Sequence, residues 1–170
     1  MPQSKCAIAL GSNLGDSLTI VNQALEVMQS RLQILAVSRW YRTKPIGYRS
    51  GVMMVVDQPD FINGCALIAT EIEPVPLLQF LLQVELYFGR LRLEAGSART
   101  LDLDLLFYED RVIVTPELHL PHPRMTDRGF VLFPLAEIAP HWQHPTQNRS
   151  VAELAAQLDH PLCQPVPYGN

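Results

Sequence analysis

Apolar and polar residues recur along the chain with spacings that predict the order of its strands and helices. An apolar run over residues 5–10 predicts a buried strand that enters a loop at Gly11. Asp16 or Ser17 is placed to cap a helix over residues 18–28, where apolar residues fall every three or four positions. Residues 33–41 alternate between two faces and predict a second strand. These segments predict the order strand, helix, strand.

The middle of the chain contains one long segment without a clear period. Residues 42–60 include two prolines and two glycines, yet also the apolar stretch 52–56. Long loops of this kind are usually functional or mobile. Residues 61–71 resemble a third strand, and an apolar helix over residues 77–88 is expected to follow two prolines and to stop at Gly89. We therefore expect an irregular segment, a strand and a helix.

The remaining pattern predicts a fourth strand over residues 100–108 and a short strand over residues 111–114. The proline-rich residues 115–123 are expected to be irregular, and a short helix is expected over residues 131–138. A serine at position 150 and a glutamate at position 153 have the spacing of a capping box, which predicts a last helix near residues 151–158.

Together the main segments run strand, helix, strand, strand, helix, strand. This is the split βαβ order of ferredoxin-like folds. We therefore predict an α+β fold: a ferredoxin-like α/β sandwich with a βαββαβ core and an antiparallel sheet, followed by extra C-terminal elements. The length of 170 residues, with neither an internal repeat nor a linker, suits a single domain over residues 1–170.

Composition narrows the class of protein. Apolar residues make up 48% of the chain and charged residues 18%, so the chain can bury a core and is unlike a disordered protein. Thirteen Lys and Arg against 17 Asp and Glu leave a net charge of −4. This balance argues against a general binder of nucleic acid backbones. Any anionic ligand must then meet a local basic cluster.

The sequence also bears on where the protein is located and on its partners. No apolar run approaches the roughly 18 residues needed to cross a bilayer, and no charged leader precedes a long apolar region. Cys6, Cys65 and Cys163 are far apart and form no C-x-x-C pair, which disfavours a disulfide framework and a zinc site. We expect a cytoplasmic monomer with neither a membrane nor a nucleic acid partner.

The sharpest chemical feature is the sequence R-T-L-D-L-D at residues 99–104. In a strand, side chains two residues apart share a face, so Asp102 and Asp104 project together. Adjacent carboxylates suit a hard divalent ion such as Mg²⁺, which takes oxygen ligands from one or two carboxylates and from substrate phosphates. A bare D-x-D is more often the solvated face of an edge strand. Aspartate-pair nucleotide-sugar transferases also carry one, although 170 residues are few for such an enzyme.

Three arginines, Arg90, Arg92 and Arg99, lie directly before these aspartates. Guanidinium groups match phosphate oxygens in bidentate geometry. The arginines and the carboxylate pair together therefore suit a polyphosphate that carries a metal ion. Surface salt bridges with neighbouring acidic residues are the plainer alternative.

Two further groups add candidate binding residues. His122 lies between two prolines and could contact a phosphate, although a lone histidine is more often structural. Phe61 and Asn63 share a strand face. An aromatic ring beside an amide suits a flat heterocycle, through stacking and through hydrogen bonds to its edge. Core packing is the commoner role of any one phenylalanine.

Six segments carry a resemblance to one family. They are G-S-N-L at residues 11–14, Y-R-T-x-P-I-G at 41–47, D-Q-P-D-F-I-N at 57–63, E-L-x-x-G-R-x-R at 85–92, R-T-L-D-L-D at 99–104 and P-H-P-R-M-x-x-R-G-F at 121–130. The chain resembles the 6-hydroxymethyl-7,8-dihydropterin pyrophosphokinases of the folate pathway, from residue 5 to about residue 140. Each motif is moderately specific, and six in this order are not expected by chance.

The resemblance implies an enzyme that transfers the terminal diphosphate of ATP to the hydroxymethyl group of a reduced pterin and releases AMP. It implies that Asp102 and Asp104 hold two Mg²⁺ ions on the triphosphate. Arg90 and Arg99 would contact the transferring diphosphate, with Arg92 nearby on a mobile loop.

The resemblance also implies further substrate-binding residues. His122 and Arg128 would contribute to the nucleotide phosphate site. The residues implied to bind the pterin are Thr43, Ile46, Phe61, Asn63 and Phe130. The two phenylalanines would sandwich the pterin ring, and the asparagine would read its edge together with the backbone around Thr43 and Ile46. The family fold is a ferredoxin-like α+β sandwich, in agreement with the order of elements above.

The chain departs from the family pattern in two segments. The family often carries a basic residue and a tryptophan shortly before the arginine of R-T-L-D-L-D, whereas residues 93–98 here are short and acidic. The loop over residues 47–57 is longer than the compact form and includes the apolar stretch 52–56. Both segments are lids in that family, so we expect closure to differ here more than the reaction.

Two other classes of protein share these features. A non-catalytic ferredoxin-like ligand-binding domain would release no AMP from ATP in the presence of Mg²⁺ and the pterin. A metal-dependent phosphohydrolase that uses the same aspartates would release phosphate or diphosphate without any pterin. The sequence contains neither a G-x-x-x-x-G-K-[ST] loop nor a convincing Ser-His-Asp set. If the chain binds ATP, metal and arginine must therefore hold the phosphates.

Overall fold

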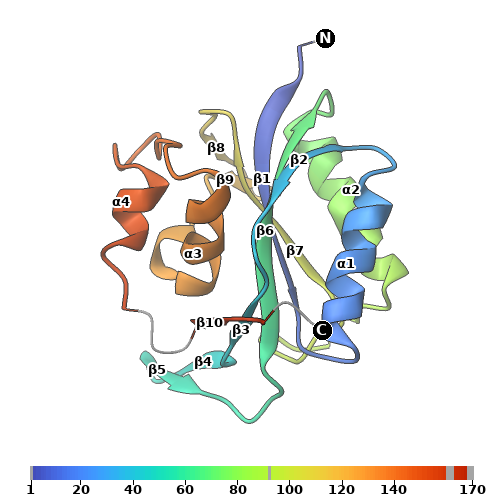
Figure 1. Cartoon of the computed structure of the whole chain (residues 1–170), viewed down its shortest axis with the longest axis vertical. Coiled ribbons are helices and arrows are strands. Elements are labelled where there is room, and N and C mark those ends of the chain that lie inside the picture. Colours follow the sequence, from blue (N-terminus) through green and yellow to red (C-terminus); the bar gives the residue numbers. More distant parts are fainter. Residues whose placement is uncertain (1, 92, 160–162, 168–170) are drawn as a thin grey trace.

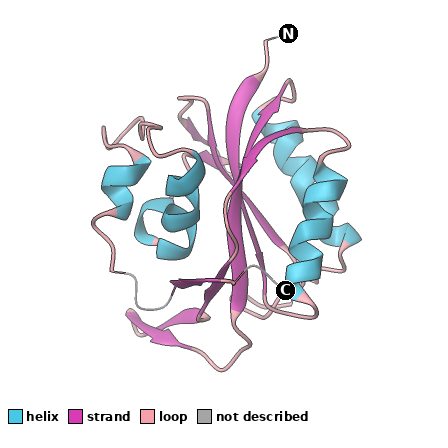
Figure 2. Ribbon diagram, in the orientation of Figure 1, coloured by secondary structure: helices cyan, strands magenta, loops and turns pink. Residues whose placement is uncertain are grey.

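The computed structural model describes residues 2–91, 93–159 and 163–167. A sheet of six strands crosses its centre, with helices on both sides (Figures 1 and 2). The strands of this sheet are β1 (Ser4–Ser12), β2 (Gln33–Val37), β3 (Tyr41–Thr43), β6 (Phe61–Thr70), β7 (Asp102–Tyr108) and β10 (Cys163–Pro165).

The strand order is β10-β3-β6-β1-β7, and β2 pairs with β6, as β3 does. Every pair in this sheet is antiparallel. The central pair runs from Ser4 opposite Thr70 to Ser12 opposite Ile62. Helix α1 (Ser17–Met28) lies between β1 and β2 in the chain, and α2 (Pro74–Tyr87) lies between β6 and β7. The predicted βαββαβ order with an antiparallel sheet is therefore confirmed.

Two helical layers cover the two faces of the sheet. Helices α1 and α2 lie on one face, and α3 (Gly129–Ile138) and α4 (Val151–Ala155) lie on the other (Figure 1). Each layer has its own apolar core. The first core includes Ile8, Leu10, Val21, Leu77, Leu81 and Leu103, and the second includes Leu106, Phe107, Leu132, Leu135 and Leu154. The extra C-terminal elements therefore cover the face that α1 and α2 leave open.

Local signals set the ends of the first two helices. Asp16 caps α1, because its side chain accepts a hydrogen bond from the backbone N–H of Thr19 at 3.2 Å. Helix α2 begins at Pro74 rather than Leu77, since proline suits the first turn of a helix. It ends before Gly89, whose φ of +78° is a left-handed conformation that glycine adopts without strain.

The prediction of one strand over residues 33–41 is wrong. β2 ends at Val37 and β3 begins at Tyr41. Between them the Ser38 hydroxyl accepts a hydrogen bond from the backbone N–H of Cys65 at 2.9 Å. A side chain thus takes the place of a backbone partner. The alternation in the sequence continues through this interruption because both strands pair with the same edge of β6.

The prediction of an irregular segment over residues 42–60 is also wrong in part. Two strands, β4 (Ile46–Arg49) and β5 (Val52–Val55), form a hairpin outside the main sheet. Ser50 and Gly51 make its turn with positive φ values of 53° and 76°, as two-residue hairpin turns require. Every residue of β5 is exposed. The strand therefore has no buried face, and alternation of apolar and polar residues could not reveal it.

Smaller differences lie between α2 and α3. β7 begins at Asp102 rather than Thr100. β8 (Ile113–Val114) pairs with β9 (His119–Leu120), and β9 lies inside the stretch that was expected to be irregular. A single 3-10 turn, Met125–Asp127, precedes α3.

The C-terminal helices follow their predicted signals closely. α3 begins at Gly129 rather than Val131. The capping box of α4 is confirmed, because the Ser150 hydroxyl accepts the backbone N–H of Glu153 at 3.2 Å and the Glu153 carboxylate accepts that of Ser150 at 2.7 Å. The helix ends at Ala155, before the expected residue 158. Strand β10 carried no pattern that predicted it.

None of the helices in the described part of the chain is long and apolar enough to cross a membrane. Cys6 and Cys65 are buried free thiols. Burial raises the pKa of Cys6 to about 12 and raises that of Cys65 as well. Both side chains therefore act as small apolar groups, as expected from their positions in β1 and β6.

Candidate active site

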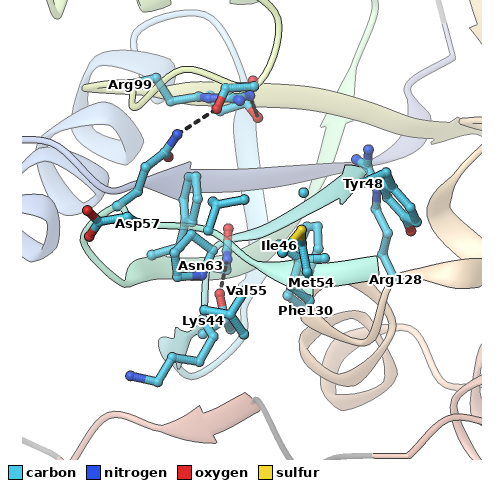
Figure 3. A pocket seen from close by; sticks show the side chains of 18 of the residues that line it. Lys44, Ile46, Tyr48, Met54, Val55, Asp57, Asn63, Arg99, Arg128 and Phe130 are labelled. Atoms are coloured by element: carbon cyan, nitrogen blue, oxygen red, sulfur yellow. Dashed lines mark hydrogen bonds and ion pairs between the residues drawn. The ribbon is translucent and has the colours of Figure 1, made fainter. Parts of the chain in front are cut away.

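A cavity of about 740 Å³ opens at one end of the sheet, on the face that α3 covers (Figure 3). Its walls come from β3, the β4–β5 hairpin, the first residues of β6, the start of α3 and the loop between α2 and β7. The five residues expected to bind a pterin all line it: Thr43, Ile46, Phe61, Asn63 and Phe130. The structure therefore brings together residues that are spread over almost ninety positions of the sequence.

Asn63 supplies a fixed polar group at the floor of this cavity. It is 8% exposed, and its amide nitrogen donates a hydrogen bond to the Thr43 hydroxyl at 2.7 Å. Gly11 pairs with Asn63 across β1 and β6. A Cβ atom at Gly11 would lie 2.5 Å from the Asn63 Oδ1 atom, so only glycine leaves room for this amide. The oxygen of Asn63 is thereby held at a defined place beside the cavity.

Two aromatic rings line the cavity, one from the sheet and one from the helix that covers it. Phe61 comes from β6 and Phe130 comes from the first turn of α3. The Arg99 guanidinium lies 5.9 Å from the centre of the Phe61 ring, and the Arg128 guanidinium lies 5.5 Å from the centre of the Phe130 ring. Each ring therefore has a cation beside it. This combination suits a flat heterocycle next to an anionic group.

A cluster of charges lies where the cavity meets β7. Asp102 lines the cavity and accepts from two arginines, with Arg90 at 2.6 Å and Arg99 at 3.0 Å. Asp104 projects from the same strand face, while the leucines between and beside the aspartates enter the first apolar core. The predicted alternation therefore holds from Leu101 to Leu105 and is interrupted after it, where Leu106 and Phe107 both enter the second core.

Glu85 was predicted only as a surface salt-bridge partner of the arginines, whereas the structure buries it within the site. This carboxylate is 2% exposed at the end of α2. Its Oε1 atom accepts from Arg90 at 2.6 Å and from the backbone N–H of Leu103 at 2.8 Å. Glu85 thus fixes Arg90 and the start of β7 at once. An acidic residue inside an otherwise apolar helix was the available signal, since a buried charge needs partners.

Asp104 and His122 face each other beside this cluster. Partial burial and the neighbouring Asp102 raise the pKa of Asp104 to about 7, although Arg128 acts in the opposite direction. Burial and the nearby Arg128 lower the pKa of His122 to about 4. The His122 Nε2 atom lies 4.0 Å from an oxygen of Asp104. Because the imidazole is neutral near pH 7, this contact is not an ion pair there.

The other predicted residues lie at or near the cavity. Arg99 and Arg128 line it, and Arg90 lies in an adjoining hollow of about 350 Å³ beneath the loop between α2 and β7. Arg92 lies outside the described residues.

A group of contacts that sequence reasoning missed connects the loops around the cavity. Asn13 is 2% exposed, and its side-chain oxygen accepts the backbone N–H of Arg99 at 2.9 Å. Its amide nitrogen donates to the Gln58 side chain at 3.0 Å, and Gln58 in turn donates to the carbonyl of Gly96 at 2.7 Å. These bonds join β1, the segment before β6 and the loop before β7. Both residues belong to matched motifs, but nothing in the motifs indicates a contact between them.

The donor set at β7 suits magnesium. Within the described residues, no group of three or more His, Cys, Asp and Glu side chains could hold a metal ion. The two aspartates are therefore a partial set of oxygen ligands. Mg²⁺ commonly binds through one or two carboxylates and completes its shell with water and substrate phosphates. Burial and the neighbouring Asp102 raise the pKa of Asp104, and a divalent cation beside the two carboxylates would stabilise the charged form.

Comparisons with known proteins agree with this geometry. A sequence model of the 7,8-dihydro-6-hydroxymethylpterin-pyrophosphokinase (HPPK) family matches residues 7–140. The 2-amino-4-hydroxy-6-hydroxymethyldihydropteridine pyrophosphokinase of Synechocystis sp. is 40% identical over 164 residues, which is 95% of this chain and 80% of that protein. The Haemophilus influenzae protein of the same name is 38% identical over 158 residues, 91% of this chain and 94% of that protein.

Solved structures show the same fold. A crystal structure of an HPPK-DHPS protein in complex with substrates superposes with a TM-score of 0.70 at 14% identity, over 92% of this chain and 43% of that one. The wild-type Plasmodium falciparum HPPK-DHPS, solved with pterin and p-hydroxybenzoate, gives a TM-score of 0.71 at 15% identity, over 92% of this chain and 42% of that one. This chain thus spans less than half the length of those proteins.

The fold, the site and the extent of these matches lead to one assignment. The match to the family covers most of the chain, and the two bacterial relatives match over 80% and 94% of their own length. The chain belongs to the 7,8-dihydro-6-hydroxymethylpterin-pyrophosphokinase family and is an ATP-dependent diphosphotransferase of folate biosynthesis.

Proposed function

We propose that residues 1–170 act as one catalytic domain in which the cavity binds 6-hydroxymethyl-7,8-dihydropterin and the charged cluster at β7 binds the phosphates of ATP. The reaction joins the hydroxymethyl oxygen of the pterin to the terminal diphosphate of ATP. The bond between the α-phosphate and the transferred diphosphate breaks, AMP leaves and the hydroxyl proton is released. The continuity of the cavity with Arg99 and Asp102 carries this proposal.

The pterin ring lies between Phe61 and Phe130 in this proposal. Both rings line the cavity, one from the sheet and one from α3, so a flat heterocycle can stack on either. Asn63 reads the edge of the heterocycle, with the backbone around Thr43 and Ile46. The fixed orientation of the Asn63 amide supports this role, because an amide that is already held needs no ordering when the ligand binds.

The arginines neutralise the phosphates. Arg90 and Arg99 contact the transferring diphosphate, and Arg92 acts beside them. His122 and Arg128 contribute to the nucleotide site from the other side of the carboxylate pair. Transfer of phosphoryl groups depends mainly on positioning and on stabilisation of charge. The two guanidinium groups within 3.0 Å of Asp102 support this role, because they lie beside a carboxylate that we assign to the metal.

Asp102 and Asp104 would hold magnesium, with two ions expected. When bound, Mg²⁺ would polarise the attacked phosphoryl group and organise the leaving group. The aspartates would set the position of the phosphates relative to the pterin only through that ion, because carboxylates repel phosphates directly. Glu85 keeps Arg90 beside the aspartates.

We further propose that the protein is a monomer that works in the cytoplasm. The chain carries every residue assigned above, so the site needs no contribution from a second copy. The buried free thiols Cys6 and Cys65 suit a reducing compartment.

Calorimetry with each substrate separately tests the pterin site. Phe61→Ala and Asn63→Ala should weaken binding of the pterin by about tenfold or more, while binding of a non-hydrolysable ATP analogue changes by less than about twofold. Phe61→Tyr is the matched control and should retain most of the pterin affinity, because the aromatic plane remains. Equal losses for both ligands would mean that these residues only pack the core.

A further inference from the structure

One carboxylate ties the end of α3 to β3, away from the cavity. The Glu137 Oε1 atom accepts a hydrogen bond from the Tyr41 hydroxyl and another from Arg39 Nε at 3.2 Å. Its second oxygen accepts the backbone N–H of Arg39 at 2.9 Å. Tyr41 is 6% exposed, whereas the Arg39 side chain is 49% exposed. The contact between Tyr41 and Glu137 is therefore the one that water screens least.

The hydrogen bond between Tyr41 and Glu137, called the tie below, involves the same face of α3 as the cavity. Phe130 and Glu137 are seven residues apart in this helix, so they lie on the same side, two turns and about 10 Å from each other. On the sheet, Tyr41 and Thr43 share the buried face of β3. Tyr41 lies opposite Asn63 and Thr43 lies opposite Phe61 in the register of β3 and β6. Besides the apolar side chains that α3 buries in the second core, this face of the helix therefore carries the hydrogen bond to Tyr41 at one end and part of the cavity wall at the other.

The hydrogen bonds of the first turn of α3 are incomplete, although Val131 and Leu132 are buried in the second core. Arg128, its N-cap residue, makes no capping hydrogen bond through its side chain. Pro134 has no N–H group, so the carbonyl of Phe130 lacks the donor that an ordinary helix supplies. The position of Phe130, which packs partly against the second core, therefore depends both on this packing and on how the C-terminal end of α3 is fixed to the sheet. Neither Tyr41 nor Glu137 lines the cavity.

We propose that Tyr41 and Glu137 are positioning residues for the pterin site: their hydrogen bond fixes α3 over β3 and thereby sets the gap between Phe130 and Phe61. This inference rests on the proposed function, which places the pterin between these two rings. Burial and the adjacent Glu137 raise the pKa of Tyr41 to about 12, so its hydroxyl stays a donor at any pH at which the enzyme works.

Four variants of the contacts around Glu137 separate positioning from general stability. Tyr41→Phe removes only the hydroxyl and leaves Glu137 paired with Arg39. Glu137→Gln keeps an oxygen that accepts from Tyr41, and Glu137→Leu removes it. Arg39→Gln is the matched control, because it removes the exposed ion pair and keeps the buried bond.

Pterin affinity is measured by calorimetry with a non-hydrolysable ATP analogue and Mg²⁺ present, and the analogue is titrated alone. We expect Tyr41→Phe and Glu137→Leu each to weaken pterin binding about fivefold, and the double variant to lose no more than either one. The loss should fall on the KM for the pterin rather than on kcat. Affinity for the analogue should stay within about twofold, and Glu137→Gln and Arg39→Gln should bind the pterin almost as the parent does.

The inference is overturned if Tyr41→Phe binds the pterin as the parent does, or if it loses affinity for the pterin and the analogue by the same factor. Phe61→Ala and Phe130→Ala, measured alongside, distinguish this failure from that of the proposed function. If they lose pterin affinity while Tyr41→Phe keeps it, the pterin site stands and the positioning role is wrong. If they too bind the pterin normally, the proposed pterin site and the positioning role both fail.

Discussion

The two faces of the central sheet differ in how completely they are closed. On the face that α1 and α2 cover, apolar side chains are buried along the length of the sheet, and Leu77 and Leu81 are fully inaccessible. The α3 face is closed in the same way only toward α4, around Leu132 and Leu135. Its other end opens into the cavity at Asn63. One layer stabilises the fold, and the other leaves part of the sheet free to bind a ligand.

Strand β7 serves both faces, and its side chains show how the division is made. Leu103 and Leu105 enter the first core, while Asp102 projects toward the cavity. A register shift against β1 then places the consecutive residues Leu106 and Phe107 in the second core. The polar end and the apolar end of the α3 face therefore lie on one strand, separated by this irregularity.

The largest effect is expected from Asp102 and Asp104, which lie on the α3 face of the sheet, called the open face because it opens into the cavity. Asp102→Asn and Asp104→Asn should each lower Mg²⁺-dependent AMP formation by about a hundredfold or more, because lost stabilisation of developing charge costs on the order of 3 kcal/mol. The midpoint of thermal unfolding should change little, since both groups lie on a polar, half-buried strand face. Near-normal AMP formation at low Mg²⁺ would show that the aspartates do not hold the metal.

Leu103→Ala is the matched control on the closed face of the same strand. Leu103 is 3% exposed. Its truncation should lower the free energy of unfolding by about 2–5 kcal/mol. At a temperature where the variant is folded, its turnover should stay within a few-fold of the parent's. If Leu103→Ala and Asp102→Asn both lower stability and turnover together, the two faces do not have separate roles.

The order of elements in the core could be predicted, because burial leaves a pattern in the sequence. Elements with one buried face leave a period, whereas the central strands β1 and β6 are buried on both faces and leave an apolar run. The hairpin β4–β5 could not be predicted, since its second strand has no buried residue. The interruption at Ser38 could not either, because a serine side chain replaces a backbone partner there without disturbing the alternation. The pattern of apolar and polar residues indicates which side chains are buried. The β4–β5 hairpin and the interruption at Ser38 do not depend on burial, so this pattern could not reveal them.

A smaller effect is expected at the apolar end of the α3 face. Helix α4 has only five residues, so its stability depends strongly on its capping box. Ser150→Ala should lower the free energy of unfolding by about 1 kcal/mol, while pterin affinity and turnover stay unchanged. Denaturant unfolding measures the first quantity and steady-state kinetics the second. A clear loss of pterin affinity in this variant would show that α4 contributes to the site.

Most individual residues of the candidate site could be predicted, whereas the contacts between them could not. The aspartates and arginines are close together in the sequence, so their chemistry could be inferred before the fold was known. The role of Glu85 in the site was missed because it comes from two partners, Arg90 and the backbone of Leu103, that only the packing of α2 on β7 brings within reach. The bond between Asn13 and Gln58 likewise joins residues 45 positions apart.

The formation of AMP from ATP and Mg²⁺, measured with and without 6-hydroxymethyl-7,8-dihydropterin, tests the account most directly. The purified protein should form AMP only when the pterin is present, in equal amount with the pterin diphosphate. Release of phosphate or diphosphate without the pterin would instead indicate a phosphohydrolase that uses Asp102 and Asp104. No AMP with both substrates bound would indicate a binding domain, and either result would contradict the assignment of the open face to diphosphate transfer.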